Sequence, residues 1–243
     1  MDITLWAAVG FLFAAYAVVG NDALQTLGTF IKSNGRFHWS VLFAFAGTVL
    51  VATFLYGWIQ YDGDPSFGRL SNTKKYPVFD PQWYHVLPPL ALLVLTRFGV
   101  PVSTTFLVLA VFASMDGLAS MMQKSLIGYG LAFTLGLVLY LILVNTLERY
   151  YSKTRDKQHA KHWVVLQWAS TTWLWSVWLM QDFANIFVFL PRTLPPLAAF
   201  GGMAMILVML ALTFANKGGP VQRILRSKSA VTDIRSATII DFT

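Results

Sequence analysis

The sequence predicts an all-α membrane protein that crosses the bilayer several times. Hydrophobic residues make up 56% of its 243 positions and charged residues only 12%, whereas soluble domains carry roughly a quarter charged residues. Apolar runs long enough to span a bilayer recur along the chain, separated by short polar loops. The chain contains no cysteine, which excludes disulfides and thiolate metal sites.

Two halves are expected, of which the first is the more complete. The first repeat, 1–147, is expected to hold a broken helix at 3–32, a helix at 39–59, a hairpin at 83–120 and a helix at 125–147. A basic loop covers 148–162. The second repeat, 163–243, is expected to hold a broken helix at 163–192, a helix at 194–215 and a basic tail. The hairpin is inferred because Gly99-Val100-Pro101 separates two short apolar segments, a pattern typical of re-entrant loops.

The distribution of positive charge predicts the orientation. Most of the 18 lysine and arginine residues lie in the loop 32–38, the loop 148–162 and the tail. Because cytoplasmic loops are enriched in these residues, we expect the N-terminus outside and the basic loops in the cytoplasm. No basic region or cleavage site precedes the first apolar run, so we expect a retained helix in a multi-pass protein of the cell (inner) membrane.

A polar stretch interrupts the first apolar helix. Asp22, Gln25 and Thr29 are spaced to share one helical face, and Gly20 is placed to ease a local break. A carboxylate at bilayer depth costs on the order of 2.5–3.5 kcal/mol even on lenient scales, so it marks a candidate functional site. The alternative is a buried polar patch that only holds helices together.

A similar stretch recurs in the second half of the chain. Gln181, Asp182 and Asn185 repeat the order amide, aspartate, amide that Asn21, Asp22 and Gln25 show in the first half. With an outside N-terminus, the two helices run in opposite directions through the membrane. This pattern predicts an inverted-repeat secondary transporter whose site lies near the bilayer midplane.

The hairpin carries three consecutive hydroxyl residues, Ser103, Thr104 and Thr105, directly after Pro101. Exposed N–H groups at the start of a helix, together with hydroxyl donors, form an anion site. The alternative is that these hydroxyls bond back to their own backbone.

Together these motifs resemble the inorganic phosphate transporter (PiT) family, sodium-dependent phosphate permeases. That family carries a Gly-Ala-Asn-Asp-Val-Ala-Asn-Ala-Phe-Gly-Thr type signature in each inverted half and a Pro-Val-Ser-Thr-Thr-His type hairpin after each one. The matching positions are Asn21, Asp22, Gly28 and Thr29 in the first signature, Asp182, Ala184 and Asn185 in the second, and Pro101 to Thr105 in the hairpin. Gln25 and Gln181 replace asparagines, Val188-Phe189 replace the second Gly-Thr, and Phe106 replaces the histidine. The family has a second hairpin, which this chain lacks, so we expect a truncated or incompletely covered transporter.

The resemblance implies Na⁺-coupled symport of inorganic phosphate by alternating access, in a homodimer. Because carboxylates repel phosphate at low dielectric, we expect the cation on the carboxylates and the anion on neutral donors. The expected Na⁺ ligands are Asp22, Asp182, Gln25, Thr29 and Gln181. The expected phosphate ligands are Ser103, Thr104, Thr105, Asn21 and Asn185. Coupling by H⁺ and transport of sulfate or another oxyanion are the alternatives within this class.

Other classes of function have less support in the sequence. No nucleophile–base pair, zinc-protease motif or phosphate-binding glycine loop occurs, so we expect neither an enzyme nor an organic cofactor. The positive charge lies in loops between apolar runs, which indicates topology rather than nucleic-acid binding. The alternative from another class is a non-transporting membrane subunit that serves as an assembly scaffold.

Overall fold

The computed structural model describes residues 3–98, 100, 102–142, 147–154, 160–216 and 233–242, and all regular structure within them is helical. In the first half, α1 (Leu5–Val18), the π-helical turn η1 (Val19–Ala23) and α2 (Leu24–Ser33) form one long helix, followed by α3 (Trp39–Gln60). The chain continues through η2 (Trp83–Val86), α4 (Leu87–Arg97), α5 (Thr104–Leu107) and η3 (Leu109–Phe112) into α6 (Met115–Ile142). The remaining helices are α7 (Glu148–Lys153), α8 (Lys161–Phe187), α9 (Pro196–Ala215) and α11 (Ile234–Asp241).

Four helical segments of the described chain are long and apolar enough to cross a membrane. They are Leu5–Ser33, Trp39–Gln60, Met115–Ile142 and Pro196–Ala215. This confirms the all-helical, membrane-type architecture that the composition predicts. The expected inverted repeat and re-entrant hairpin stay predictions.

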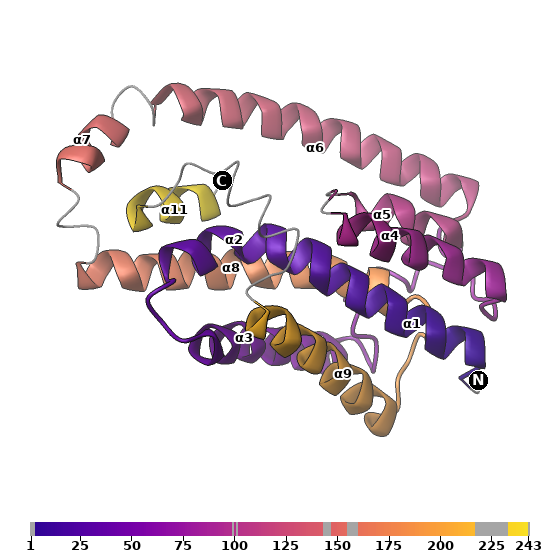
Figure 1. The fold of residues 1–243 in the computed structure, drawn as a ribbon. Helices are drawn as coiled ribbons and strands as arrows, with labels where there is room; N and C mark the ends of the chain where they lie inside the picture. The colour runs from indigo at the N-terminus through magenta and orange to yellow at the C-terminus, as the bar shows by residue number, and fades with distance from the viewer. Residues whose placement is uncertain are drawn as a thin grey trace.

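The central pair of helices consists of α1–η1–α2 and α8, which run antiparallel along the length of the molecule (Figure 1). α3 packs against α8 and α9, and α4 packs against α1. Trp175 of α8 is fully enclosed, and its indole N–H donates to the carbonyl of Ala46 in α3 at 3.1 Å. The rings of Phe54 and Phe183 pack edge to face, with their centroids 5.6 Å apart. Aromatic packing therefore fixes α8 at the centre of the bundle.

α6 stands apart from the other helices. It lies across the top of the molecule in Figure 1, and the most hydrophobic stretch of the helix is not buried against the rest of the chain. Only Gly117 and Met121 of this helix are buried. A long apolar helix exposed on nearly all sides is suited to contact with lipid.

Several element boundaries differ from those expected. The helix expected at 125–147 begins ten residues earlier, at Met115, so the last residues of the expected hairpin belong to α6. Residues 143–146, at the expected end of this helix, lie outside the described residues, as do Gly99 and Pro101. The second polar stretch does not break its helix, because α8 is α-helical from Lys161 through Phe187. The sequence 181–185 contains neither glycine nor proline, so nothing in it interrupts the helical hydrogen bonds.

Candidate ion-binding site

The π-helical turn places the first polar stretch inside the protein. A π-turn is wider than an α-turn, and such turns often occur at functional sites. Asn21 is fully buried and Asp22 is only 5% exposed. The amide of Asn21 donates to the backbone carbonyl of Val102 at 2.8 Å and to Oδ1 of Asp22 at 2.6 Å. The turn is thereby tied to the segment that leads into α5.

Asp182 enters the same region from α8. It is 3% exposed, and its Oδ2 atom has no hydrogen-bond partner among the described residues. The carboxyl groups of Asp22 and Asp182 are close enough to interact electrostatically. Two buried like charges repel strongly where little water separates them. The pair therefore favours a bound cation or a shared proton.

Thr104 joins the two halves of the site. Its hydroxyl donates to Oδ2 of Asp22 at 2.6 Å and accepts from the amide of Asn185 at 3.0 Å. The neighbouring Thr105 hydroxyl donates to Oδ1 of Asn185 at 3.3 Å. Three elements far apart in the sequence, η1, α5 and α8, thus converge on one polar cluster around the two carboxyl groups.

A cavity of about 550 Å³ adjoins this cluster. Asp22 and Asp182 line it together with the hydroxyl residues Ser103, Thr104 and Thr105. Gln25 and Gln181 lie on its exposed rim, and the Gln25 amide donates to Oδ1 of Asn21 at 3.0 Å. The space is large enough for a small hydrated ion or a tetrahedral oxyanion.

The structure brings nine of the ten expected site residues together and places the tenth elsewhere. Thr29 does not line the cavity, and its hydroxyl donates to Oδ1 of Asp241 in α11 at 2.9 Å. Seven residues of helix separate Thr29 from Asp22, a rise of about 10 Å. Helical spacing predicts both residues on one face, but a rise of two turns is too long for both side chains to reach one small ion.

Three residues near the site were not expected from the sequence. Tyr129 and Trp178 line the cavity, as does Thr26, which helical spacing places beside Asp22 and Gln25. Arg69 donates from Nη1 to the carbonyl of Gln181 at 3.2 Å and interacts electrostatically with Asp182. Arg69 lies in the long loop between α3 and η2, where no motif distinguishes it from the other loop cations.

The donor set around the cavity consists of oxygen ligands. No group of three or more histidine, cysteine, aspartate or glutamate side chains occurs in the part of the chain that the structure describes. The available ligands are two carboxylates with amide and hydroxyl oxygens, which suit hard cations better than soft transition metals. No known protein family, curated protein or solved structure matches this chain.

Proposed function

We propose that the protein is a secondary transporter that couples a monovalent cation, Na⁺, to the movement of inorganic phosphate or a similar tetrahedral oxyanion. The observation that carries this proposal is the meeting of two buried carboxylates, Asp22 and Asp182, beside a cavity in a bundle with membrane-length helices. Intramembrane carboxylates that face a cavity mark ion pathways.

The cation binds at the carboxylates in this proposal. Oδ2 of Asp182 is buried without a partner, and the facing charge of Asp22 makes a positive ion favourable between them. Protonation of one carboxyl group also removes the repulsion between the two carboxylates. A proton gradient is therefore tested beside the Na⁺ gradient.

The anion binds at the hydroxyl residues that line the cavity. In the structure the Thr104 hydroxyl donates to Asp22. A cation on Asp22 competes for that carboxylate and frees the hydroxyl to donate to an anion instead. Cation binding then favours anion binding, and the linkage is reciprocal. This gives an ordered mechanism in which the cation binds first.

Access alternates through movement of the two antiparallel helices that carry the carboxylates. In this proposal α1–α2 and α8 belong to inverted repeats, and the segment 83–112 is the re-entrant hairpin of the first repeat. The two binding regions meet where α5 contacts both helices. A relative movement of α2 and α8 would expose the cavity to one side of the membrane and then to the other.

The test is uptake of radiolabelled phosphate by proteoliposomes. We expect uptake driven by an inward Na⁺ gradient, at least tenfold above the level with choline. Asp22→Asn and Asp182→Asn abolish it, whereas Asp116→Asn, which removes an exposed carboxylate at the start of α6, leaves it unchanged. Uptake driven equally by a proton gradient would assign the coupling ion as H⁺. Competition by sulfate would show that the site accepts other tetrahedral oxyanions besides phosphate. Absence of uptake under every gradient would contradict the proposal and leave a scaffold role.

A further inference from the structure

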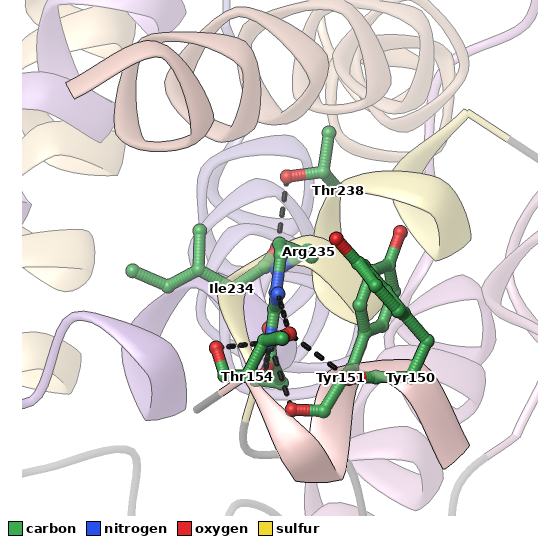
Figure 2. Close-up of polar contacts among 7 residues, drawn as sticks. Tyr150, Tyr151, Thr154, Ile234, Arg235 and Thr238 are labelled. Atoms are coloured by element: carbon green, nitrogen blue, oxygen red, sulfur yellow. Dashed lines mark hydrogen bonds and ion pairs between the residues drawn. The ribbon is translucent and has the colours of Figure 1, made fainter. Parts of the chain in front are cut away.

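Two buried charges near the C-terminus are matched by partners inside the protein. The guanidinium of Arg235 donates to the carbonyls of Tyr151 and Thr154 at 3.0 and 3.2 Å (Figure 2). The buried carboxylate of Asp241 accepts hydrogen bonds from three hydroxyl groups. Buried charges in proteins are normally matched in this way. A buried charged group that lacks such a match and lines a cavity is therefore a candidate ligand-binding group.

Asp182 is such a group. Its Oδ2 atom has no hydrogen-bond partner among the described residues, and it lines the cavity of about 550 Å³ together with Asp22. No lysine, arginine or histidine in the described part of the chain lines this cavity. Arg69 interacts electrostatically with Asp182, but its hydrogen bond goes to the carbonyl of Gln181. The lining therefore carries negative charge without a positive partner, which favours a cationic ligand.

The cavity also has the size and the walls of a site for an organic molecule. Pockets for small organic ligands enclose roughly 300–1,000 Å³, and this cavity falls within that range. Leu174, Trp178 and Asp182 recur every four residues along α8, so they lie in a row on one helical face that lines the cavity. Neighbouring members of this row are about 6 Å apart along the helix axis. Tyr129 of α6 lines the cavity as well.

The two aromatic side chains give the cavity a preference among cations. Tyr129 is 63% exposed and Trp178 is 42% exposed, so both rings are accessible to a ligand. The face of an aromatic ring attracts a cation, and the attraction is strongest where water is excluded. Because Trp178 lies one helical turn from Asp182, a ligand with its charge at Asp182 can place an apolar group against the indole. A hydrated metal ion makes no use of this aromatic wall.

We propose that the cavity binds an organic ammonium ion that carries an aromatic or apolar group. The positive charge of this ligand lies at Asp22 and Asp182, and its organic group lies against Trp178 and Tyr129. The ligand and Na⁺ then compete for the same carboxyl pair. The inference rests on the carboxyl pair of the proposed function, but its test measures binding rather than transport.

The test is equilibrium dialysis of the purified protein against radiolabelled benzyltrimethylammonium. We expect saturable binding, which Asp182→Asn should weaken tenfold or more and Asp116→Asn should leave unchanged. Choline has the same trimethylammonium group without the benzyl group, and it should displace the probe at least tenfold less well than unlabelled benzyltrimethylammonium does. Absence of saturable binding, full binding by Asp182→Asn, or equal displacement by choline would overturn the inference.

Trp178→Leu tests the aromatic wall, because leucine keeps an apolar side chain but removes the ring. We expect it to lower the affinity for the probe at least threefold. Trp173→Leu is the matched control, because it removes an exposed indole of the same helix that does not line the cavity. Tyr129→Leu is the second variant and should act in the same direction as Trp178→Leu. Affinities equal to that of the parent in both cavity variants would overturn the aromatic contribution.

Competition by Na⁺ separates this inference from the transport proposal. Displacement of the probe by Na⁺ would support both, because the two cations would then share the carboxyl pair. Binding that needs Asp182 but that Na⁺ does not displace would support the organic-cation site and contradict a Na⁺ site at the same carboxylates. Na⁺-driven phosphate uptake by a protein that binds no probe would do the reverse.

Discussion

Thr104 is the residue on which the two halves of the site depend. Its hydroxyl is a donor to Asp22 and an acceptor from Asn185, so it links η1 to α8 through α5. The sequence points to this residue as an anion ligand, because hydroxyls at a helix start are anion donors. It could not reveal the bond to Asp22, because that contact depends on how α5 packs against the first helix.

Thr104→Val should weaken phosphate binding, because the bound cation frees the Thr104 hydroxyl to donate to the anion. A hydrogen bond to a charged group contributes about 1.5–3 kcal/mol, which corresponds to roughly 10–100-fold in affinity. The measurement is the phosphate concentration that gives half-maximal uptake at saturating Na⁺. Thr48→Val is the matched control, because its exposed hydroxyl bonds to its own helix at Ala44. Unchanged phosphate dependence in Thr104→Val would show that the anion does not use this donor.

His85 provides a pH-dependent contribution to stability. It lies before α4, outside the four membrane-length segments, where its Nδ1 accepts from the backbone N–H of Gln82 at 2.9 Å and its ring packs against both Phe79 and Phe112. Burial lowers the pKa of His85 below its ordinary value of about 6.5. The neutral ring is therefore favoured in the folded protein. The stabilisation of the folded state by the neutral His85 ring is complete above about pH 6.5, and it is lost as the pH falls through the lowered pKa.

His85→Asn should make stability less sensitive to acid. Asparagine keeps an acceptor for the Gln82 N–H but does not titrate. We expect the thermal midpoint in detergent to fall less between pH 7.5 and pH 5 in this variant than in the parent. His38→Asn, at an exposed helix cap, serves as control and should retain the fall seen in the parent. The same fall in His85→Asn would exclude His85 as a source of the acid sensitivity.

At the scale of helices, the sequence predicted two breaks; the structure has a π-turn within a continuous helix at the first position and no interruption at the second. The first polar stretch contains Gly20, and the helix widens there into a π-turn. The second has the same polar order but no glycine or proline, and α8 continues through Asp182. The polar residues within apolar runs therefore identified both carboxylates in the sequence. The backbone conformation at each carboxylate depended on whether glycine is present beside it. The packing of α11 could not be predicted, because its contacts join positions far apart in the chain, as Thr29 and Asp241 are.

Close packing fixes the position of α1 relative to the segment after α8. A Cβ atom at Gly10 would collide with the ring of Phe189, whereas one at Gly128 of α6 meets nothing within 4 Å. We expect Gly10→Ala to destabilise the protein by about 1–3 kcal/mol through overpacking, measured as a lower thermal midpoint. Gly128→Ala should raise the midpoint slightly, because alanine is favoured over glycine in a helix by about 0.5–1 kcal/mol. Phe189→Leu should partly restore Gly10→Ala, and failure to do so would place the strain elsewhere.

For the whole molecule, charge predicts an orientation that thiol labelling can test. The chain has no native cysteine, so single substitutions report one position each. Gly35→Cys lies in the short loop between α2 and α3, and Thr73→Cys lies in the long loop between α3 and η2; both positions are exposed. With an outside N-terminus, an impermeant maleimide should label Thr73→Cys in intact cells and Gly35→Cys only after permeabilisation. The opposite pattern would invert the topology.

The central claim is that Asp22 and Asp182 form one cation site. The most direct measurement is stabilisation of the purified protein by Na⁺ against an equal concentration of choline. A ligand at 100 times its Kd stabilises the folded state by about 2.7 kcal/mol, so the thermal midpoint of the parent should rise. Asp22→Asn, Asp182→Asn and the double variant should all lose this rise to the same extent, because each destroys the same site. A single variant that keeps the full rise would contradict the claim.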